Sequence, residues 1–254
     1  MVFLSFVLFL SARRIANTYV AAFIVFLFSS SYYCRYNLIS STTDALCILF
    51  STSGLIILIL KPPGKRYSLL IVVCFLLAVF TRPVDPIILT VVLTSAVCQW
   101  NVKHVRFRNC LSVIVIFIHM IYIQVLYKQL NVGSVNTGSS QNQDFISFIL
   151  HALILMPKIV FFEFGLVFVR DPIMFAAFIL CGFSLAVTRN RIAIAMVLAM
   201  FFSSFYLGAL NGTIGSGFRY EMLLFIVCLI VIAAELPKVA LIVLSKYKLL
   251  FSSP

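Results

Sequence analysis

Long, uninterrupted runs of apolar side chains constrain this chain more than any motif does. Runs rich in Leu, Ile, Val and Phe recur along the whole sequence, separated by short polar or basic stretches. A soluble core does not absorb a chain that is 63% hydrophobic and only 10% charged, whereas a bilayer solvates such side chains readily. Because the runs are continuous and do not alternate with polar residues, they predict membrane helices instead of β-strands.

The positions of the runs set the expected fold class. They cover 1–12, 16–33, 45–60, 67–80, 87–97, 111–127, 145–169, 172–187, 192–210 and 222–234, with a mixed tail over 239–250. We therefore expect an all-α fold, a polytopic transmembrane bundle of about eight to ten membrane helices. Residues 1–254 should form one domain, because no linker marks a second one. The seven cysteines form no metal-ligand pattern, and we expect them to be small apolar packing residues.

Basic clusters predict the orientation of the bundle. They lie at 13–14, 61–66, 103–108, 189–191 and 238–248, in alternate gaps between the runs. The positive-inside rule places these clusters in the cytoplasm, and every acidic residue except Glu235 then falls on or near the outer side. The net charge of +12 accordingly indicates topology-setting loops against an anionic leaflet, with no nucleic acid as partner. The expected location is the cytoplasmic (inner) membrane of a prokaryote.

The alternation of loops holds only if residues 145–169 do not cross the membrane fully. A proline, Pro157, and three polar residues, His151, Lys158 and Glu163, interrupt this run and favour an interfacial or re-entrant pair of short helices. Residues 128–170 are thus expected to form a polar outer loop followed by such helices. A simple span is the alternative, and it would move the cluster at 189–191 to the outside.

The first polar feature of the predicted outer side is a Ser/Thr run that ends in Asp44. Ser40-Ser41-Thr42-Thr43 predicts the start of a helix, and Asp44 would stand in its first turn. The helix dipole alone favours a carboxylate at this position. Asp44 is therefore either a capping residue or a carboxylate that faces a polar cavity and binds a metal ion or a sugar hydroxyl.

The second feature is a stiff, charged elbow between two apolar runs. In Arg82-Pro83-Val84-Asp85-Pro86, the prolines remove backbone donors and bias Arg82 and Asp85 away from the helix. One interpretation is a local ion pair that anchors a hairpin at the interface. The other is an arginine that holds a phosphate, for which its fork of N–H groups is suited.

The third feature is a glycine-rich stretch that leads into a late apolar run. Three glycines within six residues allow a close backbone approach or a sharp turn, and Arg219, Tyr220 and Glu221 follow at the start of the next helix. Helix N–H groups together with Arg219 could hold an anionic group there. The alternative is an ordinary tight loop with an interfacial tyrosine and a cationic anchor.

Three short motifs, in this order, resemble those of the GT-C superfamily of membrane glycosyltransferases, the branch that uses dolichyl- or polyprenyl-phosphate sugars. They are Thr43-Asp44-Ala45-Leu46, Thr81-Arg82-Pro83 and Phe218-Arg219-Tyr220. The resemblance implies an active site at the extracytoplasmic face and a polyprenyl-phosphate-sugar donor that enters from the bilayer. It also implies a glycan, lipid or protein acceptor and a divalent metal ion, Mg²⁺ or Mn²⁺.

The resemblance assigns roles to the polar residues described above. Asp44 would be the catalytic acid/base or metal ligand, with Asp85 behind it, and the substrate-binding residues would be Arg82, Arg219, Tyr220 and Glu221. The family places its catalytic acid in a large first outer loop, but no Asp or Glu precedes Asp44 here. Three interpretations stay open: a truncated chain, a different role for Asp44, or an inactive relative.

A non-catalytic membrane protein is the alternative function. It would be a transporter or flippase for a lipid-linked glycan, or a subunit of a cell-envelope glycan complex. Nearly all charges lie at predicted helix ends, which argues against an ion-coupled transporter. The lack of a family-type first outer loop favours the subunit, so the sequence leaves open whether the protein is an enzyme that transfers a hexosyl or pentosyl group.

Overall fold

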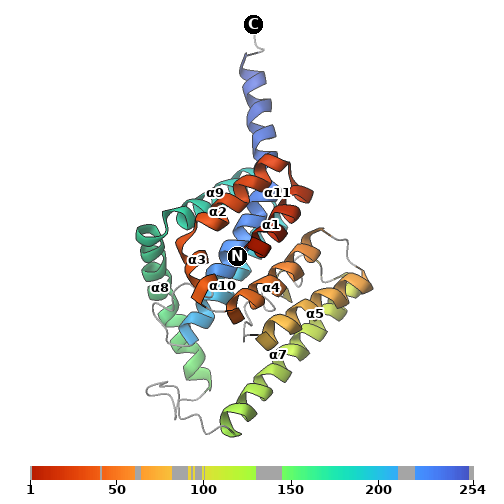
Figure 1. Ribbon diagram of the computed structural model, residues 1–254, viewed down its shortest axis with the longest axis vertical. Coiled ribbons are helices and arrows are strands. Elements are labelled where there is room, and N and C mark those ends of the chain that lie inside the picture. Colours follow the sequence, from red (N-terminus) through yellow and green to blue (C-terminus); the bar gives the residue numbers. More distant parts are fainter. Residues whose placement is uncertain are drawn as a thin grey trace.

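The computed structural model describes residues 2–40, 42–60, 64–81, 91–92, 94, 99, 101–129, 145–210 and 221–251. All the regular structure in these ranges is α-helical, which confirms the predicted all-α class. The helices, shown in Figure 1, are α1 (Val2–Ile15), α2 (Thr18–Ser30), α3 (Tyr32–Ser40), α4 (Thr42–Leu60), α5 (Lys65–Thr81), α7 (Lys103–Gln129), α8 (Phe145–Arg170), α9 (Pro172–Thr188), α10 (Arg191–Leu210) and α11 (Glu221–Phe251).

Helix α11 is the central element of the bundle. Every side chain from Met222 to Ala233 is buried, so this part of the helix is covered on all sides. It contacts α9, α10, α2, α1 and α4. Uniform apolar character of this kind is typical of a helix enclosed by other helices or by lipid. Figure 1 shows the last turns of α11 projecting beyond the other helices.

Helices α4, α5 and α7 pack in sequence on one side of the bundle (Figure 1). Helices α4 and α5 form an antiparallel hairpin, and Gly54 of α4 allows their close approach. A Cβ atom at Gly54 would lie 2.7 Å from Cε1 of Phe75, a ring that is itself fully enclosed. The hairpin therefore depends on the missing side chain at this position.

Two breaks between helices are joined by one buried carboxylate, that of Asp171. Helices α8 and α9 meet at Asp171 with a bend of 118°. Its Oδ1 accepts the backbone N–H of Met174 (3.0 Å), which caps α9. Its Oδ2 accepts the Ser31 hydroxyl (2.6 Å) and the backbone N–H of Tyr33 (3.0 Å), at the break between α2 and α3. One side chain thus satisfies orphan N–H groups of two helices.

The apolar runs and the helices differ in several places. The run over 16–33 becomes α2 and α3, because the chain breaks at Ser31. The run over 222–234 and the mixed tail form one helix, α11, that continues through Pro237. Residues 145–169 fall within a single helix, α8, instead of two short helices. The outer loop predicted over 128–144 lies, from residue 130 on, outside the described residues.

The basic cluster at 103–108 is helical and not a loop. It forms the first turns of α7, and Arg108 is only 3% exposed. Its terminal nitrogen is 3.4 Å from Oδ1 of Asn109, and burial lowers the pKa of the Arg108 guanidinium to about 10. Arg108 is therefore part of the packing of α7, and it does not face solvent as a topology-setting charge would.

Membrane-spanning potential is clearest in α11. Within the described ranges, the segment Met222–Ser245 is the one helix long and apolar enough to cross a membrane by itself. The bent pair Leu153–Arg170 and Pro172–Thr188 passes the same test if it counts as one broken span. A core helix of a soluble protein has similar properties, so the number of membrane helices stays a prediction.

Substitution of Gly54 by alanine should destabilise the α4–α5 hairpin. The new methyl group must displace the buried ring of Phe75, and overpacking of this kind costs about 1–3 kcal/mol. Gly182→Ala is the matched control, since a Cβ atom there meets nothing within 4 Å and alanine favours helix by up to about 1 kcal/mol. Thermal unfolding of both variants in detergent measures the difference. A Gly54→Ala variant as stable as Gly182→Ala would contradict the packing described here.

Candidate functional site

Most of the residues predicted to form the site fall outside the described part of the chain. Arg82, Asp85, Arg219 and Tyr220 lie in ranges that the structure does not describe. Asp44 stands in the first turn of α4, as expected, and Glu221 is the first residue of α11, but the side chains of both are not described. Their roles therefore stay predictions.

The helix ends that carry two of the motifs do lie together. The start of α4 and the end of α5 are neighbours in the hairpin, where the Thr81 side chain lies near the Cys47 thiol and donates its proton to the Ala78 carbonyl oxygen (2.7 Å). Asp44 is one helical turn before Cys47, and Arg82 directly follows Thr81. The structure thus brings the backbone of the Thr43–Leu46 motif close to the point where the Thr81–Pro83 motif begins.

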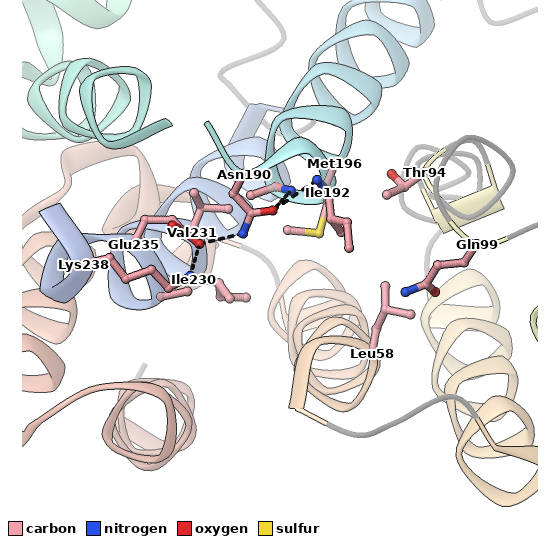
Figure 2. A pocket seen from close by; sticks show the side chains of 12 residues that line it. Leu58, Thr94, Gln99, Asn190, Ile192, Met196, Ile230, Val231, Glu235 and Lys238 are labelled. Atoms are coloured by element: carbon pink, nitrogen blue, oxygen red, sulfur yellow. Dashed lines mark hydrogen bonds and ion pairs between the residues drawn. The ribbon is translucent and has the colours of Figure 1, made fainter. Parts of the chain in front are cut away.

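The described residues also form a polar cavity that the sequence motifs do not include. It has a volume of about 300 Å³ and lies between α4, α10, α11 and the stretch before α7. Its polar lining consists of Thr94, Gln99, Asn190, Glu235 and Lys238 (Figure 2). Apolar side chains complete the wall, among them Leu58, Met196 and Ile230.

Glu235 is the buried charge of this cavity. It is 1% exposed, and its Oε1 accepts hydrogen bonds from Asn190 Nδ2 (2.8 Å) and Lys238 Nζ (2.8 Å). The Lys238 side chain is 54% exposed, so the ion pair runs from the interior toward the surface. The other carboxylate oxygen of Glu235, Oε2, is buried and has no hydrogen-bond partner among the described residues. Such an orphan acceptor is costly unless a ligand or water reaches it.

The nearby Thr188 hydroxyl does not donate a hydrogen bond to Oε2 of Glu235. It lies close to the Glu235 carboxylate, but it donates its single proton to the carbonyl oxygen of Ser184 at 2.9 Å. This back-bond within α9 is common for threonine in apolar helices. Oε2 of Glu235 is therefore open to a donor from the cavity.

The corner between α9 and α10 positions Asn190. Arg189 ends α9 in the left-handed region (φ 51°), with its N–H bonded to the Leu185 carbonyl at 2.8 Å. Asn190 then caps α10, and its Oδ1 accepts the backbone N–H groups of Ile192 (3.1 Å) and Ala193 (3.3 Å). With Oδ1 fixed by the cap, the amide nitrogen points toward Glu235 (Figure 2).

Two features of the sequence indicate this site. An asparagine just before an apolar run is a typical N-cap, and Asn190 lies within the basic cluster at 189–191 that precedes the run over 192–210. Glu235 is an acidic residue between two apolar stretches, which indicates a functional or paired carboxylate. No sequence pattern indicates that Asn190 and Glu235 are in contact.

Residues near each predicted cytoplasmic cluster line cavities along one section of α11, residues 230–238. The end of α1, next to Arg13, packs Ala12 and Ile15 around a small void with Ile230 and Ala233. Around the larger cavity, Leu58 precedes the cluster at 61–66, Gln99 precedes that at 103–108, Asn190 lies within that at 189–191, and Lys238 begins the last. The parts of the chain next to these clusters therefore lie around this section of α11.

The first turns of α4 and α11 lie away from this cavity. Thr42 precedes the cavity residue Leu58 by about 24 Å of helix, and Glu221 precedes Glu235 by about 21 Å, at 1.5 Å per residue. The cavity and the motif-bearing helix starts are thus separate regions. Over the described ranges, no three His, Cys, Asp or Glu side chains are close enough to hold a metal ion.

A double-mutant cycle at Glu235 and Lys238 should show coupling. Lys238→Met leaves the buried carboxylate with Asn190 alone. The substitution should therefore cost more stability in the wild-type protein than in the Glu235→Gln background. Because Lys238 is half exposed, the coupling should be about 1 kcal/mol. Thermal unfolding measures it, with Lys158→Met, an exposed lysine of α8, as control. Strictly additive effects would show that the pair contributes nothing.

Comparison with protein-family models, with curated proteins and with solved structures finds no match for this chain. The resemblance to GT-C glycosyltransferases therefore rests on its three short motifs.

Proposed function

We propose that this chain is a polytopic helical protein of the cytoplasmic membrane. The observation that carries the proposal is the exposure of large apolar side chains around the outside of the bundle. Tyr19 and Phe161 are each 86% exposed and Val169 is 76% exposed, and similar side chains project from the other long helices. In water such a surface would drive aggregation, whereas lipid tails solvate it without cost.

Within the membrane, we propose a glycosyltransferase-like function at the extracytoplasmic face. The protein would move a sugar from a polyprenyl-phosphate-linked donor to a glycan, lipid or protein acceptor. Two features support this proposal: the α4 start adjoins the α5 end, and the α4 and α11 starts lie away from the basic clusters. The three motifs thus belong to helix ends remote from the predicted cytoplasmic side.

The proposed chemistry is a direct displacement. The Asp44 carboxylate, or Asp85 behind it, accepts the proton of an acceptor hydroxyl, whose oxygen attacks the anomeric carbon as the lipid phosphate leaves. Arg82 and Arg219 neutralise the leaving phosphate, and Tyr220 and Glu221 complete substrate binding. If Asp44 also holds Mg²⁺ or Mn²⁺, the ion supplies further positive charge for the phosphate.

An ion pair with a buried carboxylate favours a second candidate, a transporter or flippase for a lipid-linked glycan. Glu235 and Lys238 lie within Met222–Ser245, the segment best suited to cross a membrane, and they line a cavity. Intramembrane charges of this kind are common along substrate pathways. Reconstituted protein assayed in parallel for sugar transfer and for lipid scrambling separates the two functions: scrambling without transfer would replace the glycosyltransferase proposal.

Cysteine labelling should place the two ends of the bundle on opposite sides of the membrane. Asp144 is the last residue of the predicted outer loop and directly precedes α8. An Asp144→Cys variant should react with a membrane-impermeant maleimide on intact cells. Lys65→Cys, in the exposed first turn of α5, should react only after permeabilisation. Both variants carry Cys110→Ser, which removes the one exposed thiol among the cysteines that the structure describes. Equal labelling of both sites on intact cells would refute the orientation.

Sugar transfer should depend on Asp44 and Arg219. Asp44→Asn removes the proton acceptor and should abolish transfer in membranes supplied with a polyprenyl-phosphate sugar. Arg219→Ala should raise the KM for the donor more than that for the acceptor, because it removes a phosphate contact. Arg35→Ala, an exposed arginine of α3 outside the motifs, is the matched control. Wild-type transfer by Asp44→Asn would remove Asp44 from the site.

A further inference from the structure

We propose that the cavity between α4, α10 and α11 binds a neutral, polyhydroxylated ligand of about monosaccharide size, through Glu235, Asn190 and Thr94. This site lies at the end of the bundle opposite the motif-bearing helix starts, so the inference does not rest on the glycosyltransferase function. It concerns a second binding site, reached from the side of the basic clusters.

Two buried polar atoms in the cavity lack partners. Oε2 of Glu235 and Oγ1 of Thr94 are both fully enclosed, in residues 1% and 6% exposed, and no described group hydrogen-bonds with either. They come from different parts of the chain and line the same space. Two unsatisfied groups that share one cavity are costly, and one bound molecule that reached both would satisfy them together.

The size of the cavity favours an organic ligand over single waters. A site for one water needs only about 10–15 Å³ of such volume, whereas small-molecule pockets begin at roughly 300 Å³. The volume here is about 300 Å³. The wall includes the apolar side chains of Met196 and Ile230, against which the C–H face of a sugar ring can pack.

Charge balance selects a neutral ligand. Lys238 already neutralises Glu235, so the lining carries no net charge. An anion would meet the open carboxylate oxygen, and a cation would meet the ammonium group of Lys238. Hydroxyl groups avoid both penalties because each is neutral and can donate as well as accept.

The polar lining is complementary to several hydroxyl groups. Oε2 of Glu235 accepts one hydrogen bond, and the second N–H of the Asn190 amide is left to donate one, since a single N–H is used on Glu235. Thr94 and Gln99 lie across the cavity from Glu235 and offer a hydroxyl and an amide (Figure 2). A polyol that spans the cavity can therefore satisfy both orphan atoms together.

Ligand-induced stabilisation of the purified full-length protein tests the proposal. The protein is kept in a detergent without sugar groups, and thermal unfolding is followed against D-glucose, myo-inositol, ethylammonium chloride and sodium phosphate. We expect glucose or inositol to raise the midpoint with a saturable dependence on concentration, and the two ions to give no saturable rise. Octyl glucoside added to the same protein distinguishes a glycolipid headgroup from a free sugar.

Two threonine variants provide the matched comparison. Thr94→Val removes the cavity hydroxyl and should weaken polyol binding about five- to tenfold. Thr52→Val removes an equally buried and unpartnered hydroxyl of α4 that does not line the cavity, and it should leave binding unchanged. Saturable stabilisation by either ion, no stabilisation by any polyol or octyl glucoside, or equal effects of Thr94→Val and Thr52→Val would each overturn the proposal.

Discussion

The structure depends on the enclosure of α11 by the helices around it. Its first half is apolar on every face, and such a segment is stable only when other helices or lipid cover it completely. Helices α1, α2, α9 and α10 provide most of that cover. A buried charge lies just beyond the enclosed segment: Glu235 is tolerated there because Asn190 and Lys238 both hydrogen-bond to it.

Several of the buried polar contacts in this bundle form where helices end. A helix end in an apolar environment leaves N–H groups without water, so side chains must satisfy them. Asp171 does this for α9 and α3 together, and Asn190 does it for α10. Asn190 also reaches Glu235 with the atoms that the cap does not use. The corner between α9 and α10 therefore supplies one polar group of the cavity lining, the amide of Asn190.

The sequence predicted the helices well and their meeting points poorly. Continuous apolar runs identify helices almost by length alone, and α4, α5, α9 and α10 fall close to the expected runs. Run length does not reveal a break such as that at Ser31, which depends on Asp171 far along the chain. The pairing of Asn190 with Glu235 was invisible for the same reason, since it joins positions 45 residues apart. Asp44 and Glu221 were correctly expected in the first turns of helices.

The hydrogen bonds of Asp171 to the α2–α3 break constrain when this corner of the bundle can form. Its bond to Ser31 joins residues separated by 140 positions, and that to Tyr33 joins residues separated by 138. During synthesis the α2–α3 break therefore emerges long before its carboxylate partner exists. The hydrogen bonds that close the α2–α3 corner can therefore form only after Asp171, at the start of α9, has been synthesised.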